Sequence, residues 1–216
     1  MPTAIVVGAS GLVGRELVRE LVEGRGFDGV TSLGRRKLDL PAAKVTERIV
    51  DFKDSSSLES AMDGDVLFSS LGTTRNKAGS KEAQWEVDHT FQLRAAQAAA
   101  TRGVQTYVLI SASTADARSI AFYNRMKGDL DDAVQKLGFR ACHILRPSIL
   151  DGDRSESRPG ERFGLAAMQL LRAIPGLRKH RPIHARIVAR AMITAALDPR
   201  EGAFVHGPEE LFSMGA

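Results

Sequence analysis

The sequence contains little cysteine, few aromatic residues and no long apolar run. Cys142 is its single cysteine, which excludes an internal disulfide and is typical of a reducing compartment. No apolar stretch is long enough to cross a bilayer. The chain enters a strand-like pattern at residue 3, without the basic segment and cleavage site of a secretory signal. We therefore expect a cytoplasmic protein with no membrane partner.

Two further classes of partner are not expected. The formal net charge is +4, and the 30 Lys and Arg residues are spread along the chain rather than gathered on one face. Aromatic residues make up 6% of the sequence and form no stacking platform, so no nucleic-acid partner is predicted. His180 and His184 have the spacing of a helical ligand pair, but Pro182 lies between them. The sequence therefore predicts no metal site.

Short apolar segments alternate with helical patterns along nearly all of the 216 residues. This order is typical of a parallel sheet covered by helices on both faces, the doubly wound α/β or Rossmann arrangement. Predicted strands cover residues 3–7, 29–33, 45–50, 65–70, 105–110, 142–147 and 203–206. Predicted helices cover residues 15–23, 80–101, 119–137, 163–174 and 187–197, with another opened by a capping box at Ser56 and Glu59. We expect one domain, in which residues 1–150 form the dinucleotide-binding core and residues 151–216 a short substrate lobe.

A glycine-rich turn follows the first predicted strand. Gly8, Gly11 and Gly14 are spaced G-x-x-G-x-x-G and lead directly into the helix predicted for residues 15–23. Glycine permits a tight turn and a close approach of the main chain to a ligand. The N–H groups at the start of the helix then face that ligand with the positive end of the helix dipole. This order predicts a pyrophosphate-binding turn, and an ordinary turn is the alternative.

The turn after the second strand carries positive charge. Arg35 and Arg36 lie there, and no Asp or Glu does. In dinucleotide-binding folds an acidic residue at this place binds the ribose 2′-hydroxyl, whereas arginine accommodates a 2′-phosphate. A guanidinium binds phosphate through two hydrogen bonds and stacks on adenine. We therefore predict NADP(H) in preference to NAD(H), with a solvated basic turn as the alternative.

Two further strand ends are candidates for the adenosine half of the cofactor. Asp51 and Phe52 follow the third strand, where they suit the adenine edge or are ordinary strand-end residues. Gly72 and Thr73 follow the fourth strand, where glycine permits close approach and a hydroxyl reaches a ribose. The carboxyl ends of parallel strands line the ligand crevice in such sheets, so these residues are candidates to contact the adenosine half of the cofactor.

Tyr123 and Lys127 are one turn apart on the helix predicted for residues 119–137. An ammonium beside a phenol favours phenolate, so we expect the pKa of Tyr123 to be lowered. Such a tyrosine exchanges a proton with a substrate hydroxyl or carbonyl. Ser111 and Ser113 follow the fifth strand and are both candidates to orient that oxygen. The alternative is a surface tyrosine beside a solvated lysine.

Together these segments resemble the short-chain dehydrogenase/reductase superfamily. The sequence is most similar to its atypical branch of Tat-interacting-protein-like oxidoreductases, and the resemblance covers nearly the whole chain. The motifs that carry it are Leu33-Gly-Arg-Arg-Lys37, Val50-Asp-Phe52, Leu71-Gly-Thr-Thr-Arg75, Lys77-Ala-Gly-Ser80, Tyr123-x-x-x-Lys-Gly128, Leu145-Arg-Pro147, Gly152-Asp-Arg154 and Glu156-Ser-Arg-Pro-Gly-Glu161.

The resemblance implies a cofactor site along the sheet edge. The pyrophosphate lies, by this resemblance, on the turn from Gly8 to Gly14, which contributes Ser10, Gly11, Leu12 and Val13. The 2′-phosphate and adenine are assigned to Arg35 and Arg36. The adenosine side is flanked by Leu71 and Gly72. The nicotinamide end is assigned to Tyr123, Lys127, Pro147, Leu150 and Arg158.

The implied activity is hydride transfer between NADP(H) and a small carbonyl or alcohol substrate. Tyr123 is the implied acid/base, Lys127 tunes it and holds the ribose, and Ser113 or Ser111 polarises the substrate oxygen. Many superfamily members have an asparagine where this chain has Asp88. We expect Asp88 on a solvated helix face, with support of a water near the site as the alternative.

A second hypothesis is a non-catalytic NADP(H) sensor that acts through a protein partner. The intact pair of Tyr123 and Lys127 favours the enzyme. Superfamily enzymes often pair through the fourth and fifth helices, so a homodimer is an open prediction for the oligomeric state.

Overall fold

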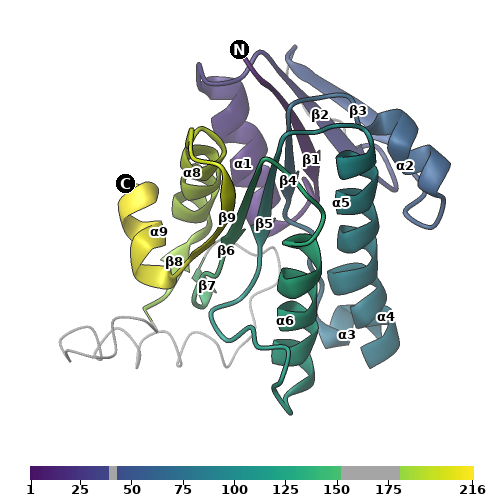
Figure 1. The fold of residues 1–216 in the computed structure, drawn as a ribbon, viewed down its shortest axis with the longest axis vertical. Coiled ribbons are helices and arrows are strands. Elements are labelled where there is room, and N and C mark those ends of the chain that lie inside the picture. The colour runs from purple at the N-terminus through teal and green to yellow at the C-terminus, as the bar shows by residue number, and fades with distance from the viewer. Residues whose placement is uncertain (39–42, 152–180) are drawn as a thin grey trace.

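The computed structural model describes residues 1–38, 43–151 and 181–216. Seven parallel strands form one sheet in the order β3-β2-β1-β4-β5-β6-β9 (Figure 1). They are β1 (Thr3–Val7), β2 (Gly29–Gly34), β3 (Val45–Ile49), β4 (Val66–Ser69), β5 (Thr106–Ile110), β6 (Ala141–Leu145) and β9 (Gly202–His206). Each lies within two residues of its predicted position, so the predicted fold class is confirmed. The strand order reverses between β1 and β4, and the crevice at their carboxyl ends is where such sheets bind ligands.

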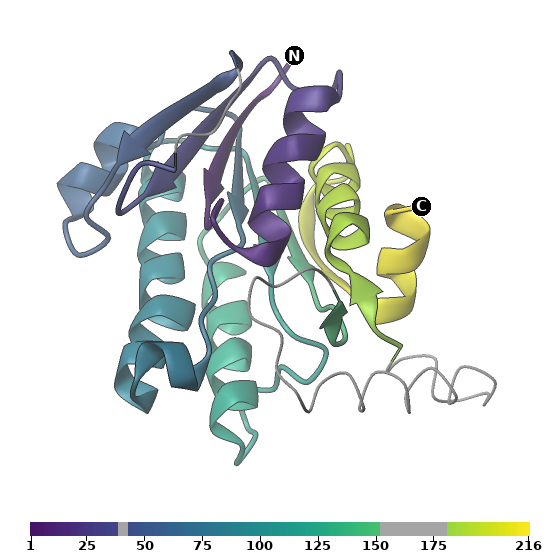
Figure 2. The ribbon, with the colours of Figure 1, turned by 180° about the vertical axis from the view of Figure 1, so that it is seen from behind.

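Helices cover both faces of the sheet. Figure 1 shows α5 (Phe91–Thr101) and α6 (Phe122–Val134) in front of it. Figure 2, seen from behind, shows α1 (Leu12–Glu23) and α8 (Ala185–Ala196) on the opposite face. The shorter helices α2 (Ser55–Ala61) and α9 (Pro208–Met214) pack beside α5 and α8, respectively. This is the doubly wound arrangement that the alternation of segments predicts.

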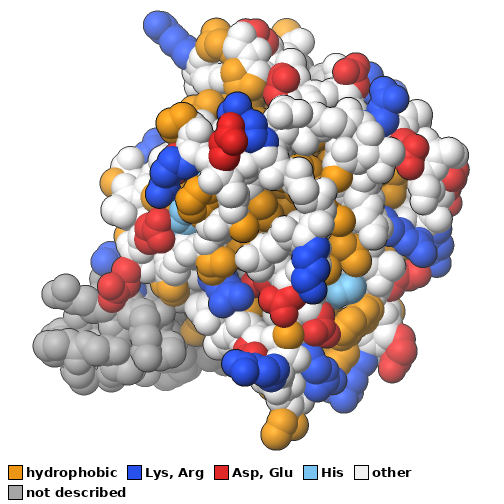
Figure 3. All heavy atoms as spheres, viewed as in Figure 1, with side chains coloured by type: hydrophobic (Ala, Val, Ile, Leu, Met, Phe, Trp, Pro, Cys, Tyr) orange, Lys and Arg blue, Asp and Glu red, His pale blue; other side chains and the backbone are white. Residues whose placement is uncertain are grey.

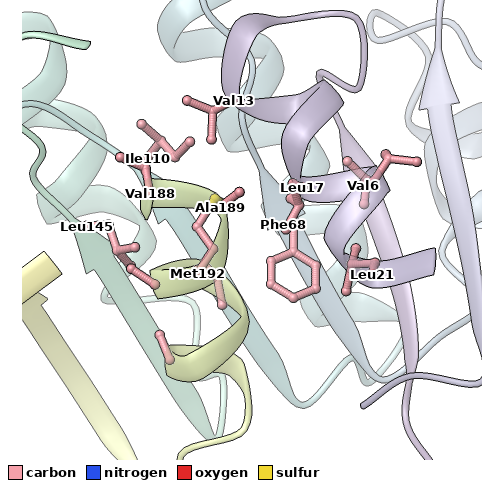
Figure 4. Close-up of a cluster of buried hydrophobic side chains, with 14 of the residues drawn as sticks. Val6, Val13, Leu17, Leu21, Phe68, Ile110, Leu145, Val188, Ala189 and Met192 are labelled. Carbon is pink, nitrogen blue, oxygen red and sulfur yellow. The ribbon is translucent and has the colours of Figure 1, made fainter. Parts of the chain in front are cut away.

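The core consists of one apolar layer on each face of the sheet. Val6 and Phe68 face the layer formed with α1 and α8, where they lie near Leu17 (Figure 4). Their neighbours Ile5 and Leu67 face the opposite layer, formed with α2 and α5. Because neither face of a central parallel strand meets water, these strands are apolar throughout and show no polar alternation.

The helix predicted for residues 80–101 is interrupted. Two short helices, α3 (Arg75–Ala78) and α4 (Lys81–Trp85), precede a π-helical turn, η1 (Glu86–Thr90), that leads into α5. Single π turns within helices are frequent at functional sites, and Asp88 lies in this one. The predicted capping box at Ser56 is also wrong, because the carboxylate of Asp54 caps α2 by accepting the Ser56 N–H at 2.9 Å.

The C-terminal segment extends the same sheet. β9 pairs in parallel with β6, and α8 packs on α1, where Glu20 accepts hydrogen bonds from Arg186 at 2.5 Å and Arg190 at 3.0 Å. A second, small sheet pairs β7 (Leu150–Asp151) with β8 (Ile183–His184). Residues 181–216 of the predicted C-terminal lobe therefore complete the main core. The helix predicted for residues 163–174 lies outside the described residues, as do residues 152–180 as a whole.

Basic and acidic side chains are interspersed on the face drawn in Figure 3. Within residues 1–38, 43–151 and 181–216, no helix has the length and apolar character needed to cross a membrane. The same stretches hold no group of three or more His, Cys, Asp or Glu side chains arranged to bind a metal ion.

Candidate functional site

The N-terminal turn is shaped by two glycines that have no room for a side chain. Gly8 adopts a positive φ of 92°, and a Cβ there would lie 2.5 Å from the carbonyl carbon of Ser70. A Cβ on Gly14 would lie 2.1 Å from the carbonyl oxygen of Gly8. The first glycine thus lets β1 and β4 end side by side, and the second lets α1 start against the turn. No side chain of the described residues caps α1 at Gly11, so its first N–H groups remain for an anion.

A cavity of about 350 Å³ opens at this turn. It brings together the ends of β1, β2 and β4 with α3, α4 and η1. Seven residues predicted for the cofactor line it: Gly8, Ser10, Gly11, Arg35, Leu71, Gly72 and Thr73. The wall is completed by residues that sequence reasoning did not select: Ser70, Lys77, Ala78, Ala83, Glu86 and Val87. Lys77 belongs to a motif quoted for the resemblance, which is the one signal that pointed to this wall.

Two cations and one carboxylate line the cavity. Arg35 from the end of β2 and Lys77 from α3 are its cations, and the carboxylate of Glu86 is paired with Lys53 at 2.9 Å. Arg36 is exposed and does not line the cavity. A cavity with two cations and bare main chain suits an anionic ligand.

The two residues predicted for the adenine edge lie outside the cavity lining. Asp51 is exposed, and its carboxylate accepts the N–H of Lys53 at 2.8 Å. Phe52 is buried and stacks on Phe91 with ring centroids 5.3 Å apart. The Phe52 ring is therefore part of the core, and a contact of either residue with adenine stays a prediction.

Tyr123 and Lys127 lie on α6, at the edge of the sheet where β5 ends. The side chain of Lys127 is 4% exposed, and its Nζ donates to the carbonyl oxygen of Ile110 at 2.9 Å. Tyr123, in the first turn of α6, is 42% exposed. Gly128 lets the β5–α6 loop lie against the helix, because a Cβ there would be 2.0 Å from the Ala117 nitrogen. The carbonyl of Ile110 thus holds Lys127 at the same edge as the cavity, and Tyr123 lies one turn before it on α6.

The surroundings of Tyr123 reverse one prediction. Desolvation raises the pKa of Tyr123 to about 12, and the charges of Asp88 and Asp131 add to the increase. The expected lowering of the Tyr123 pKa is therefore wrong. Lys127 is buried against a main-chain carbonyl, and burial lowers its own pKa. Helical spacing alone did not reveal the acidic neighbours.

Asp131 and Asp88 are site residues that sequence reasoning missed or misplaced. Asp131 is fully buried and forms an ion pair with Arg146 at 2.9 Å. It lies four residues after Lys127, so the spacing that selected the pair could also have selected it. Asp88 was expected on a solvated face, but it is 3% exposed and its Oδ1 accepts the Thr73 N–H at 2.6 Å. η1 packs against α4, α5 and α6, and Asp88 is buried there.

The two candidate serines differ in exposure. Ser111 is buried, and its N–H donates to the carbonyl of Leu145 at 2.7 Å. Ser113 is exposed, and its N–H donates to the carbonyl of Pro147 at 3.0 Å. These two backbone hydrogen bonds connect the segments that follow β5 and β6. The exposure of Ser113 favours it as the serine that a substrate reaches.

Of the remaining residues predicted to bind the cofactor, the structure describes all but one. Leu12, Val13 and Gly14 form the first turn of α1, and Leu150 lies in β7. Arg158 lies outside the described residues. The structure thus brings the glycine turn, Arg35 and the β4 end into one cavity, and it leaves the nicotinamide end as a prediction.

Residues 8–164 match the sequence model of a family described as NAD(P)H-binding. This chain belongs to that NAD(P)H-binding family. The matched range starts at the first glycine of the turn and contains the described cavity, Tyr123 and Lys127. A nicotinamide cofactor is therefore supported by the family as well as by the turn.

Relatives of this NAD(P)H-binding chain match it over most of its length. Protein fmp52, mitochondrial, from Aspergillus fumigatus is 33% identical over 227 residues, which cover 100% of this chain and 95% of the relative. Protein FMP52, mitochondrial, from Candida glabrata is 41% identical over 161 residues, which cover 73% of this chain and 68% of the relative.

Solved structures share the fold of the NAD(P)H-binding chain. MoeE5 in complex with UDP-glucose and NAD has a TM-score of 0.70 at 22% identity, with 99% of this chain and 81% of that chain covered. A short-chain dehydrogenase/reductase superfamily protein from Agrobacterium tumefaciens with bound NAD has a TM-score of 0.69 at 19% identity. The match covers 95% of this chain and 77% of that chain. These structures confirm the expected fold, and the matching sequence model confirms the expected NAD(P)H-binding family.

The expectation of a cytoplasmic protein is wrong. Relatives that match at least 99% of this chain carry names that describe mitochondrial proteins. A lone buried cysteine separates reducing from oxidising compartments. It does not separate one reducing compartment from another, so it gave no basis for choosing the cytoplasm.

Proposed function

We propose that this chain is an NADP(H)-dependent oxidoreductase that reduces a small carbonyl compound to an alcohol, with Tyr123 as general acid. The observation that supports it most is the shared edge of the sheet. The cavity at Gly8 and Gly11 follows β1 and β4, and Lys127 is held at the end of the neighbouring β5. In parallel sheets this edge is where a dinucleotide crosses from one half of the fold to the other.

The residues of the cavity fit NADP(H). Gly8, Gly11 and Gly72 line the cavity without a side chain, and Gly72 borders open space. Main chain can therefore approach a pyrophosphate closely. Arg35 and Lys77 supply two cations for a 2′-phosphate. This supports the preference for NADP(H) over NAD(H). When bound, the cofactor supplies the hydride that adds to the carbonyl carbon.

Tyr123 supplies the proton in this scheme. With a pKa raised to about 12, its hydroxyl is protonated at neutral pH and donates to the substrate oxygen as the alcohol forms. Ser113 hydrogen-bonds that oxygen from the exposed end of β5, with the buried Ser111 as the alternative. Lys127 lies one turn further along α6 and contributes positive charge where negative charge develops.

The test replaces Tyr123 with phenylalanine. NADPH affinity, measured by calorimetry, should stay within about twofold, because the phenol hydroxyl acts on the substrate. Turnover of a reactive carbonyl probe, such as 9,10-phenanthrenequinone, should fall by about 10²–10⁴-fold. Tyr107→Phe is the matched control, since this other tyrosine is fully buried in β5 and should leave turnover unchanged.

The non-catalytic NADP(H) sensor is separated from the enzyme by the same assay. A wild-type chain that binds NADPH and turns over none of a broad carbonyl panel would support the sensor. The names of the fungal relatives support a mitochondrial setting for either activity. The small carbonyl substrate and the homodimer stay predictions.

A further inference from the structure

Three titratable side chains that the proposed chemistry does not use are linked to one another at the β6–β9 end of the sheet. Nδ1 of His143 lies 3.0 Å from Nε2 of His206, and Nδ1 of His206 lies 2.6 Å from Oε1 of Glu210. His143 belongs to β6, His206 to β9 and Glu210 to α9. The two histidines are 0% and 2% exposed, whereas the Glu210 side chain is 48% exposed. The His143–His206–Glu210 chain therefore leads from solvent to a fully buried ring.

The register of β6 and β9 places both imidazoles on one face of the sheet. Phe204 lies opposite His143, and His206 lies opposite Leu145. Because side chains alternate along a strand, His143 points to the face where Leu145 packs in the layer of α8. The ring of His143 stacks on Phe204 at 5.0 Å and on His206 at 5.3 Å between centroids. Packing thus fixes both rings, and their contacts indicate where their hydrogens lie.

The carboxylate determines the position of each hydrogen. An ionised carboxylate only accepts, so a neutral His206 carries its hydrogen on Nδ1 and donates it to Glu210. Nε2 of His206 is then an acceptor, which requires His143 to donate from Nδ1. Nε2 of His143 carries no hydrogen, and this buried atom has no hydrogen-bond partner among the residues that the structure describes. In this order every imidazole N–H is paired.

A further proton does not fit into this order. The two ring nitrogens that face each other at 3.0 Å hold one hydrogen between them, and Nδ1 of His206 already carries one. An additional hydrogen on the imidazoles must therefore be placed on Nε2 of His143, where the described part of the chain offers no acceptor. A buried N–H without an acceptor, on a pair that has gained positive charge, is strongly disfavoured. The chain is thus stable while its two histidines are neutral.

Charged groups near His143 do not change this result. Asp198 and Arg200, from the turn before β9, act on it with opposite signs and are paired with each other at 2.8 Å. The arginines of α8, which packs on β6, form ion pairs with α1 instead. Burial and the neighbouring His206 lower the pKa of His143 to about 4, despite the opposing charge of Glu210.

The chain is also one of the contacts that hold α9 in place. Leu211 of α9 is fully buried in the layer of α8, and the hydroxyl of Thr194 donates to the carbonyl of Met214 at 2.9 Å. These two contacts contain no group that titrates near neutral pH. The contact between Glu210 and His206 does contain one, so part of the attachment of α9 depends on protonation.

We infer that the His143–His206–Glu210 chain is a pH-sensitive switch that holds β9 and α9 on the sheet while both histidines are neutral. When β9 and α9 detach, Nε2 of His143 reaches water and the pair takes up a proton. Uptake of that proton favours the detached state, so acid conditions release the C-terminal segment. The switch needs neither cofactor nor turnover, so its test is independent of the proposed function.

The pH range of the switch follows from the burial of His143. A histidine in contact with water titrates near pH 6.5, whereas the pKa of buried His143 is lowered to about 4. The attachment is therefore at full strength above about pH 6.5 and weakens progressively as the pH falls toward 4. At pH 5.5 detachment should be favoured about tenfold more than at pH 7.5.

Hydrogen exchange followed by mass spectrometry tests the switch in the whole chain. After correction for the intrinsic pH dependence of exchange, protection of peptides from β9 and α9 should be about tenfold lower at pH 5.5 than at pH 7.5. Equal protection at the two pH values would overturn the inference.

His143→Asn separates the switch from other effects of acid. The asparagine keeps an amide N–H near the place of Nδ1 and has no group that titrates in this range, so the loss of protection at pH 5.5 should disappear. His184→Asn is the matched control, because it removes an exposed histidine from the N-cap of α8 and should retain the loss. A loss that persists undiminished in His143→Asn would contradict the switch.

A measurement on the wild type decides the matter when His143→Asn does not fold. Long-range ¹H–¹⁵N correlation spectra of histidine-labelled protein show which ring nitrogen carries hydrogen. At pH 7.5 both His143 and His206 should carry it on Nδ1. A hydrogen on Nε2 of either ring would refute the order on which the switch depends.

Glu210→Ala tests the solvent end of the chain. It removes the acceptor that orders both rings, so protection of α9 at pH 7.5 should fall by about tenfold. Glu209→Ala is the matched control, because Glu209 is also exposed and also lies in the first turn of α9, where both carboxylates interact with the helix end. Equal losses in the two variants would show that Glu210 acts on the helix end rather than on His206, and the inference would then be wrong.

Discussion

Around the N-terminal turn the candidate site consists of main chain, whereas around Lys127 it consists of buried charged side chains. Gly8 and Gly14 shape the turn by having no side chain, and the adjoining cavity is lined by this main chain together with Arg35 and Lys77. Lys127, Asp88 and Asp131 are instead almost fully buried. Main-chain donors bind a phosphate without any change in protonation. Acid–base chemistry requires groups whose protonation the surroundings control, and burial provides that control.

The two regions should therefore be sensitive to different kinds of substitution. The turn is sensitive to added volume, because its atoms already lie at contact distance. The charged region is sensitive to the loss of one partner, because a buried charge is left without compensation. Substitutions that change only volume or only charge test this difference.

Gly8→Ala should have the largest effect. It forces a side chain into left-handed backbone and against the Ser70 carbonyl carbon, so we expect a loss of about 1–3 kcal/mol in unfolding free energy and about 100-fold in NADPH affinity from the displaced turn. Gly103→Ala is the matched control, since Gly103 also has a positive φ but borders open space. It should be destabilised without loss of NADPH affinity. An alanine at position 8 that binds NADPH normally contradicts the description of the turn.

Arg146→Met comes next. It leaves the fully buried Asp131 without its ion-pair partner, and we expect the free energy of unfolding to fall by about 2–3 kcal/mol. The comparison is Arg140→Met, which breaks an exposed pair with Glu201 and should change the unfolding free energy by less than about 0.5 kcal/mol. Urea denaturation measures both. Similar values for the two variants would show that burial does not set the energetics of the charged region.

Arg35→Ala should have the smallest effect. It removes one of the two cavity cations, so NADPH affinity should fall by about tenfold while NADH affinity stays nearly constant, as expected for one charge-assisted contact to a 2′-phosphate. Arg36→Ala, outside the cavity lining, should have less effect. Equal losses for NADPH and NADH would remove the basis for the cofactor preference.

The turn region was predictable from the sequence because its causes are local. The strand 3–7, the glycine spacing and the helix that follows are contiguous, and the structure reproduces them within a few residues. Arg35 follows in the same way from its place at the end of β2. Glycine spacing and strand ends are read directly from neighbouring residues.

The charged region was not predictable to the same degree because burial has distant causes. Asp88 has the sequence context of an ordinary polar helix residue. It is 3% exposed in the fold, where the segment after β4 contacts it through the Thr73 N–H. The Tyr123 pKa was predicted in the wrong direction because its spacing from Lys127 is local, whereas its desolvation is not. Asp131 shares the i, i+4 spacing of the pair, so its position could be predicted, but its ion pair with Arg146, which follows β6, could not.

The position of β9 bears on how the chain is synthesised. β9 follows every other strand of the main sheet in sequence, yet it pairs with β6. While a ribosome extends the chain, β1 to β6 emerge first, and β6 is then an edge strand with open N–H and C=O groups. His143 and Leu145 are fully buried in the folded protein. We expect them to become buried once α8 and β9 have been synthesised and have packed against β6. A chain truncated before β9 would present that edge to other chains as a template for aggregation.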